Sequence, residues 1–194
     1  MKNSKTLVSA LAFLILILGA CTNNGDDSPE VKPSENPMAT ILQDATWTQK
    51  TSTATWELGF IFSTSVDGKI TQLGCKMPEP GTYTVSLWDQ STKTLLRQKT
   101  VEQSSPDKFV SANIDELLLT KDKKYAVSVN TFIGGSAKKY YYVTNSNSNI
   151  FPIVRGSILI QSSAYKSSAT PKYPDDGGAL GSLYGYPDFT FIPN

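Results

Sequence analysis

The chain has 194 residues, with 18 lysines and arginines against 17 aspartates and glutamates, and no histidine. This near balance of charge, with lysines clustered only in pairs, argues against a nucleic-acid partner. The lack of histidine excludes hydrolases that use an imidazole base and metal sites built from histidine ligands. Neither a Gly-rich phosphate loop nor an EF-hand spacing is present, so no cofactor is expected.

Residues 1–20 predict a signal peptide. Lys2 and Lys5 precede an apolar run over residues 7–20, which at about 1.5 Å per residue is too short to cross a hydrocarbon core of about 30 Å. The stretch LGAC that ends at Cys21 resembles the lipobox of bacterial lipoproteins. The resemblance implies that Cys21 becomes the first mature residue and holds the protein on a membrane by its acyl chains. An ordinary signal peptide, in which Cys21 has no special role, and an uncleaved anchor stay open.

Residues 21–37 predict a flexible tether. They are acidic and rich in proline, and they contain one large aliphatic residue, Val31, so they cannot bury enough apolar surface to fold. The GDD at residues 25–27 resembles the export signal of surface-exposed lipoproteins in Bacteroidetes. This resemblance implies an outer-membrane location on the cell surface, with the periplasmic face as the alternative.

Residues 38–194 predict an all-β domain, because apolar and polar residues alternate repeatedly between turn residues. The expected strands cover residues 55–63, 66–77, 78–89, 93–101, 108–114, 125–132, 138–144, 156–165 and 186–194. About nine short strands at this spacing predict an antiparallel β-sandwich, Ig-like or jelly-roll-like. Cys75 lies on the apolar face of its strand, and we expect it to be buried rather than reactive.

Four stretches carry a resemblance to one family. They are ELGFIFSTSVDGKITQLG from residue 57, GTYTVSLWDQSTKTLL from residue 81, KKYAVSVNT from residue 123 and the closing YPDFTFIPN. Together they resemble a family of bacterial extracellular β-sandwich domains of unknown function. The family usually has a Gly–Trp before its middle strand, where this chain has SPDKFV from residue 105. The resemblance implies a secreted β-sandwich beside carbohydrate-active or adhesive modules, and it implies no particular activity.

We expect the domain to be a non-catalytic binding module for a glycan, since aromatic rings on β-sandwiches stack on sugar faces. Tyrosines in the late loops and strands are the candidate ligand-binding residues, and Trp56 and Trp88 are expected in the core or at a corner. The candidates are Tyr140, Tyr142, Tyr165, Tyr173, Tyr184 and Tyr186. A structural or adhesive role, or one as an accessory subunit that binds an envelope protein, is the alternative.

Two further possibilities depend on carboxylates. Asp175 and Asp176 precede two glycines and are weak candidates for a calcium site, although two acids fall short of a ligand set and a solvated turn is favoured. A glycosidase needs only two carboxylates, so it stays open as a minor alternative to a protein that is not an enzyme. Its candidates are Glu57, Asp67, Glu79, Asp89 and the Asp175–Asp176 pair.

Overall fold

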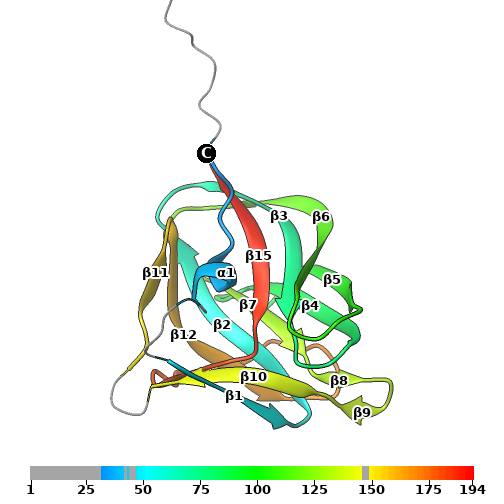
Figure 1. The fold of residues 1–194 in the computed structure, drawn as a ribbon. Coiled ribbons are helices and arrows are strands. Elements are labelled where there is room, and N and C mark those ends of the chain that lie inside the picture. Colours follow the sequence, from blue (N-terminus) through cyan, green and yellow to red (C-terminus); the bar gives the residue numbers. More distant parts are fainter. Residues whose placement is uncertain (1–31, 42, 44–46, 146–148) are drawn as a thin grey trace, which may run out of the picture. The chain divides into compact units, whose positions relative to one another are not determined.

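The computed structural model describes residues 32–41, 43, 47–145 and 149–194, and these form an almost all-β unit (Figure 1). Cys21, the predicted signal peptide and the predicted tether as far as Val31 lie outside the described residues. One short helix, α1 (Pro37–Ile41), precedes the strands. The strands are β1 (Thr48–Thr53), β2 (Trp56–Thr64), β3 (Gly68–Lys76), β4 (Gly81–Asp89), β5 (Leu95–Gln103), β6 (Phe109–Leu119), β7 (Tyr125–Asn130), β8 (Phe132–Ile133), β9 (Ser136–Ala137), β10 (Lys139–Thr144), β11 (Ile153–Arg155), β12 (Ile158–Ser167), β13 (Asp176–Gly177), β14 (Ser182–Tyr184) and β15 (Pro187–Pro193).

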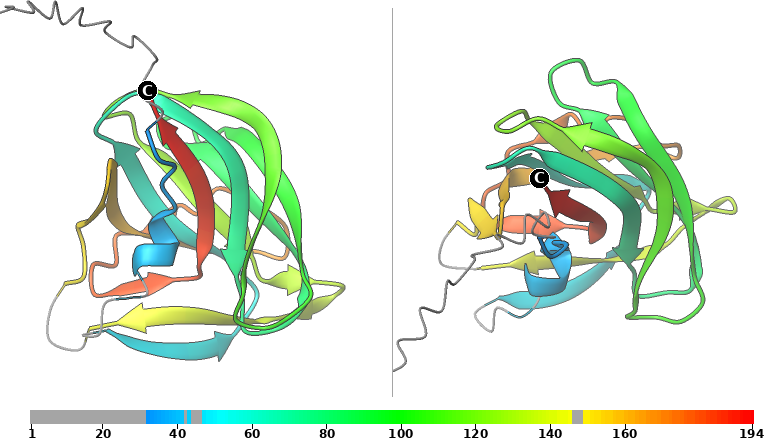
Figure 2. Two further views of the ribbon diagram at one scale, coloured as in Figure 1. Left: turned by 45° about the horizontal axis from the view of Figure 1, so that its top comes forward. Right: turned by 90° about the horizontal axis from the view of Figure 1, so that it is seen from above.

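Three antiparallel sheets make the sandwich-like arrangement that the alternation predicts. The largest has the order β11-β12-β2-β7-β4-β5, with β13 paired to β12. A second sheet has the order β15-β3-β6, and a third, β1-β10-β14, crosses one end of the molecule (Figure 1). A small hairpin, β8-β9, stands apart from them. Figure 2 shows β15, drawn in red, lying between α1 and β3.

The core lies between the large sheet and the β15-β3-β6 sheet. Phe60 and Phe62 of β2 are fully buried, and the Phe62 ring stacks on Phe189 of β15 with centroids 4.5 Å apart. Gly59 allows β2 to approach β7, since a Cβ atom there would lie 1.9 Å from the backbone oxygen of Val127. The aromatic residues on the apolar face of β2 therefore fill the core between the two sheets.

The prediction does not include the short strands β9, β11, β13 and β14, and two longer strands also differ from it. Residues 108–114 belong to one strand, β6, that continues to Leu119. The polar segment TQKTST forms β1, whose six residues are all exposed. It contains no apolar residue, so an alternation of apolar and polar residues could not predict it. Cys75 is fully buried, as its pattern predicts, and burial raises the pKa of its thiol to about 12. No helix within the described part of the chain is long and apolar enough to span a membrane.

Residues 32–41 pack on the C-terminal strand. The backbone N–H of Glu35 donates to the Phe191 oxygen at 2.8 Å, and the Phe191 N–H donates back at 2.9 Å. Lys32 donates to the backbone oxygen of Asn194, while Met38 and Ile41 are fully buried. The compact unit therefore begins at Lys32, six residues before the predicted domain start at residue 38.

Candidate binding site

An aromatic hollow of about 240 Å³ opens beside the β1-β10-β14 sheet. Its walls are the rings of Trp56, Tyr140, Tyr165 and Tyr184, and its floor is Leu58, which is 2 % exposed. Tyr142 does not line the hollow but contacts two of its rings, Tyr140 and Tyr184, with centroids 6.5 and 5.8 Å away. We refer to the four lining rings and Leu58 as the aromatic hollow.

Strand register brings these rings together from distant parts of the sequence. Tyr142 of β10 pairs directly with Tyr184 of β14, and directly paired residues share one face of a sheet. Tyr165 of β12 pairs with Leu58 of β2, two residues after Trp56. The intervening Tyr141 points to the opposite face and is buried, because side chains alternate along a strand.

A glycine turn holds Tyr184 against the floor of the aromatic hollow. Gly185 follows Tyr184 with a φ of +72°, a conformation that glycine adopts without strain. Its N–H donates to the Tyr141 oxygen at 2.8 Å, and a Cβ atom there would lie 2.7 Å from the Cβ of Leu58. Any larger residue at position 185 would therefore push Tyr184 away from Leu58.

The rings around the hollow meet nearly at right angles. Trp56 and Tyr165 have centroids 5.9 Å apart with an interplanar angle of 87°, and Tyr165 and Tyr184 are 5.6 Å apart at 78°. Edge-to-face contacts of this kind are favourable between aromatic rings. They hold the walls in place without a ligand.

The polar atoms of the hollow are free to bind a ligand or water. Within the described part of the chain, side-chain hydrogen bonds of tyrosine oxygens involve other residues, namely Tyr83, Tyr125 and Tyr186. The hydroxyls of Tyr140, Tyr165 and Tyr184 and the indole N–H of Trp56 have no such partner among the residues described. The hollow thus combines apolar ring faces with unpaired donors and acceptors.

Exposed polar residues flank the hollow through the strand pairing. Lys50 and Ser52 of β1 pair with Tyr142 and Tyr140, and Asp176 of β13 pairs with Tyr165. All three flanking residues are exposed. An ammonium, a hydroxyl and a carboxylate therefore surround the aromatic face, and each can bond a polar group of a ligand.

Two of the six predicted tyrosines lie elsewhere. Tyr186 is fully buried and stacks on Tyr141 with centroids 5.3 Å apart, and burial raises the pKa of its phenol. Tyr173 is half-buried, meets Trp88 edge-on at 6.1 Å, and lies under the ammonium of Lys93 at 5.6 Å. The structure thus unites Tyr140, Tyr142, Tyr165 and Tyr184 and leaves Tyr173 and Tyr186 out of the cluster.

Trp56 belongs to the hollow although its sequence pattern places it in the core. It shares the alternation of Leu58, Phe60 and Phe62, which are buried, but it is the first residue of β2 and only half-buried. The sequence signal that marks it is the polar stretch TSTAT directly before it. An aromatic residue at the boundary between a polar segment and a strand can contribute to a surface site.

The predicted calcium candidates do not form a ligand set. Lys166 donates to Asp175, and Lys93 lies 3.7 Å from the same carboxylate, so the pKa of Asp175 is lowered, chiefly by the bond from Lys166. Asp176 of β13 instead pairs with Tyr165 of β12. No group of three or more acidic, cysteine or histidine side chains that could hold a metal occurs among residues 32–41, 43, 47–145 and 149–194.

Glu57, a carboxylate candidate from the sequence, is fully buried on the opposite face of β2 from Leu58. Ser128 donates to its Oε1 at 2.5 Å and Asn130 to its Oε2 at 2.9 Å. Trp88 donates in turn to the Ser128 hydroxyl at 2.9 Å. Desolvation raises the pKa of Glu57 to about 7 in spite of these bonds.

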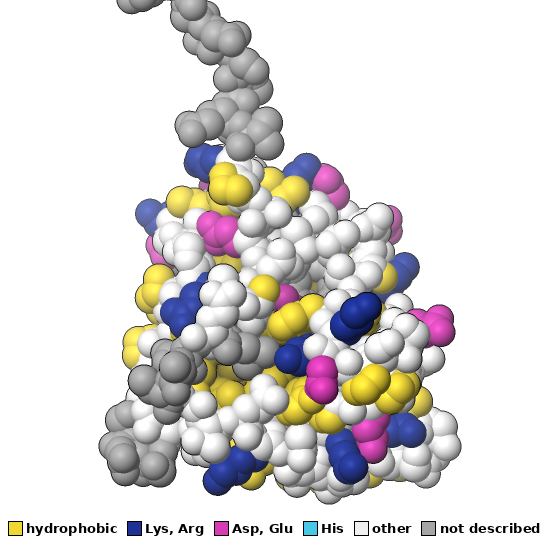
Figure 3. All heavy atoms as spheres, viewed as in Figure 1, with side chains coloured by type: hydrophobic (Ala, Val, Ile, Leu, Met, Phe, Trp, Pro, Cys, Tyr) yellow, Lys and Arg dark blue, Asp and Glu magenta, His cyan; other side chains and the backbone are white. Residues whose placement is uncertain are grey.

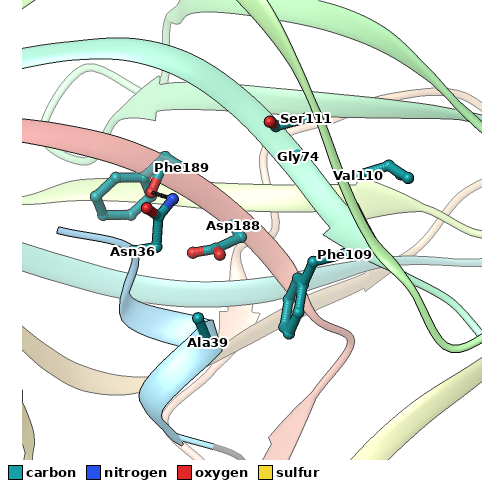
Figure 4. Close-up of a pocket in the computed structure, with 8 residues that line it drawn as sticks. All are labelled: Asn36, Ala39, Gly74, Phe109, Val110, Ser111, Asp188 and Phe189. Atoms are coloured by element: carbon teal, nitrogen blue, oxygen red, sulfur yellow. Dashed lines mark hydrogen bonds between the residues drawn. The ribbon is translucent and has the colours of Figure 1, made fainter. Parts of the chain in front are cut away.

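A second hollow, of about 140 Å³, contains a buried carboxylate that the sequence did not reveal (Figure 4). Asp188, which is 6 % exposed, lies between Asn36 and Phe109, and its carboxylate is turned toward the side of Asn36 (Figure 4). The N–H of Met38 donates to its Oδ1 at 3.2 Å, and desolvation raises its pKa to about 7. Asp188 thus holds the start of α1 on β15, and its burial depends on residues that a sequence pattern cannot bring together.

Charged side chains are spread singly over the visible face, with both signs intermixed (Figure 3). Some of the charged side chains form ion pairs, such as Lys123 with Asp89 at 2.7 Å. That contact is the largest cause of the lowered pKa of Asp89. The surface in view therefore shows no broad field of one sign that would attract a polyanion or a polycation.

Residues 43–183 match a protein-family model described as "Domain of unknown function (DUF4082)". No curated protein matches the chain. The family match includes Trp56, Leu58, Tyr140 and Tyr165 and ends one residue before Tyr184.

Proposed function

Because the chain belongs to the family described as a domain of unknown function (DUF4082), which assigns it no activity, we propose from its own geometry that the domain is a non-catalytic, glycan-binding module. The observation that carries the proposal is the aromatic hollow, in which four rings surround about 240 Å³. Carbohydrates offer apolar C–H faces that pack on aromatic rings and hydroxyls that need donors and acceptors nearby.

The polar surroundings of the hollow support a hydroxyl-rich ligand. Three phenol hydroxyls and the Trp56 indole N–H lack partners in the described part of the protein. Lys50, Ser52 and Asp176 flank the rings. A purely apolar ligand would bury these polar atoms without a hydrogen bond, at a penalty of about 1–3 kcal/mol each.

The proposed attachment of the protein is a lipid on Cys21 in the bacterial outer membrane, on the cell surface. The described chain begins at Lys32 beside Asn194, at the end of the sandwich opposite β1 and β10 (Figure 1). β2 runs nine residues from Trp56 towards that end, which is roughly 25 Å at about 3.3 Å per residue. The hollow therefore lies at the end of the sandwich that is remote from Lys32. Mass spectrometry of the mature N-terminus tests the anchor, and an unmodified Cys21 would refute it.

A second candidate function is binding of a protein partner at the edge of β1. Among the strands of the described residues it pairs with β10 alone, and its six residues are all exposed. An exposed edge strand can add a strand from another chain. This role would make the protein an accessory or adhesive subunit of a cell-envelope complex.

The test uses the mature chain, residues 21–194, with Cys21→Ser so that no lipid is added. We expect binding on a glycan array, and we expect Trp56→Ala and Tyr184→Ala each to abolish it. Tyr173→Ala is the matched control, since Tyr173 is a half-buried ring outside the hollow. Near-UV circular dichroism of each variant confirms that it is folded.

Two results would count against glycan binding. Array signal that survives both hollow variants would show that the sugar binds elsewhere. Stable co-purification with an envelope protein, lost when proline replaces Thr51 and accompanied by no glycan signal, would favour the edge of β1. Proline lacks the N–H that an added strand would need.

A further inference from the structure

The aromatic hollow is partly open to solvent, and the arrangement of its rings selects among carbohydrate ligands. Resting on the proposed function, we infer that the hollow takes the end of a glycan chain, one terminal sugar ring at a time, and not an internal stretch of an extended polysaccharide. The inference depends on the angles between the rings, the closed floor and the volume.

The ring planes block a chain that runs across the site. A platform for several successive sugars needs aromatic faces that follow one another with similar orientation. Here Tyr165 stands edge-on to both neighbours, at 87° to Trp56 and at 78° to Tyr184. A sugar stacked on one of these rings therefore meets the neighbouring ring at a steep angle, and successive sugar units find no run of similarly oriented faces to follow.

The floor and the back of the hollow are closed as well. Leu58 is 2 % exposed and contacts the Gly185 turn, so no path leads under the rings. Tyr140 is 8 % exposed, and Tyr142 packs behind it. A bound glycan therefore extends away from Leu58 and into solvent.

The volume fits one ring. Pockets for drug-sized molecules enclose about 300–1,000 Å³, and this hollow encloses about 240 Å³. Further sugar units of a longer glycan lie outside it, beside exposed residues such as Lys50 and Asp176. A second unit can bond these residues, and units beyond it gain few contacts and add little to affinity.

Chain-length dependence of affinity tests the inference directly. The mature chain with Cys21→Ser is titrated calorimetrically with methyl glycosides of glucose, galactose, mannose, N-acetylglucosamine and galacturonic acid, and with matching oligosaccharides of two to six units. We expect affinity for the preferred series to rise less than about threefold beyond the second unit. A tenfold or larger rise between two and six units would overturn chain-end recognition while leaving glycan binding intact. No heat with any saccharide, and none on the array, would instead refute the proposed function.

The role of the Tyr165 ring as a barrier between Trp56 and Tyr184 is tested by Tyr165→Ala, which removes this ring. We expect at least a tenfold loss of affinity for the methyl glycoside, and at least a fivefold rise in the ratio of hexasaccharide to methyl-glycoside affinity. Tyr165→Phe keeps the ring and should keep that ratio within twofold. Tyr173→Ala, outside the hollow, should change neither quantity. If Tyr165→Ala lowers the affinities for the methyl glycoside and for the hexasaccharide by the same factor, the Tyr165 ring is not such a barrier and the inference fails.

Discussion

The two ends of the sandwich differ in whether their polar side chains are hydrogen-bonded within the protein. At the end where the described chain begins, Glu35 is bonded through both its backbone and its side chain. Its carboxylate accepts from the N–H and the hydroxyl of Ser157 at 2.8 and 3.0 Å. At the other end, the indole of Trp56 and the hydroxyls of Tyr165 and Tyr184 have no partner in the part of the chain the structure describes.

The closed end connects two sheets through residues 32–41. The backbone of Glu35 bridges to β15, and its side chain reaches Ser157 in the turn between β11 and β12. Asn36 donates to the Phe189 oxygen and to the Thr190 hydroxyl, both at 3.0 Å. Every polar side chain named here has a partner inside the protein, as expected for a structural contact.

This difference between the two ends distinguishes residues that stabilise the fold from residues that are available to a ligand. Buried polar groups that bond to one another stabilise the fold. Aromatic groups that are held rigidly but left with unpaired polar atoms are prepared for a ligand. Substitutions at the closed end should therefore change stability, and substitutions in the hollow should change binding.

The largest expected effect comes from Met38, a fully buried residue of α1. Met38→Ala should lower the free energy of unfolding by about 2–5 kcal/mol, because it removes core contacts and leaves a cavity. Thr40→Ala, at an exposed position of the same helix, should change it by less than about 1 kcal/mol. Urea unfolding measures both values. Equal effects would show that residues 32–41 do not belong to the core.

An intermediate effect concerns pH. Desolvation raises the pKa of both Glu57 and Asp188 to about 7. Each carboxyl is neutral in both the folded and the unfolded state at low pH, and the folded state resists its ionisation. The free energy of unfolding should therefore be highest near pH 4 and fall as pH rises to about 7, on the order of 3 kcal/mol for each group.

Asp188→Asn should flatten part of this fall, since an amide cannot ionise and its Oδ1 can still accept from Met38. Glu102→Gln, at an exposed carboxylate of β5, is the control and should leave the profile unchanged. Denaturant titrations between pH 4 and 8 measure the profiles. A wild-type stability that rises over this interval would contradict the burial of these groups.

The smallest expected effect on stability lies in the hollow. Tyr140→Phe, Tyr165→Phe and Tyr184→Phe each remove a hydroxyl that has no bond within the residues described. Each should change the free energy of unfolding by less than about 0.5 kcal/mol. Glycan affinity should nevertheless fall several-fold for at least one of the three, because hydroxyls of the ligand lose a partner. Tyr83→Phe is the contrasting control, since its hydroxyl donates to the Glu79 oxygen at 2.8 Å.

The alternation of apolar and polar residues correctly predicted the β-sandwich class, most of the long strands and the burial of Cys75. Side chains alternate along a strand, so a local pattern reveals which residues share a face. The same alternation indicated that Tyr140 and Tyr142 lie together and that Tyr141 lies opposite. It also explains why β1 and the place of Trp56 were missed, since β1 has no apolar face and Trp56 shares the pattern of core residues.

Only the tertiary structure decided which faces meet. Tyr165 and Tyr184 join Trp56 because β12 pairs with β2 and because Gly185 turns the chain over Leu58. Asp188 is buried because Met38, 150 residues earlier, packs over it. Pairings between residues so far apart depend on the packing of the whole chain, and a pattern confined to neighbouring residues contains no information about them.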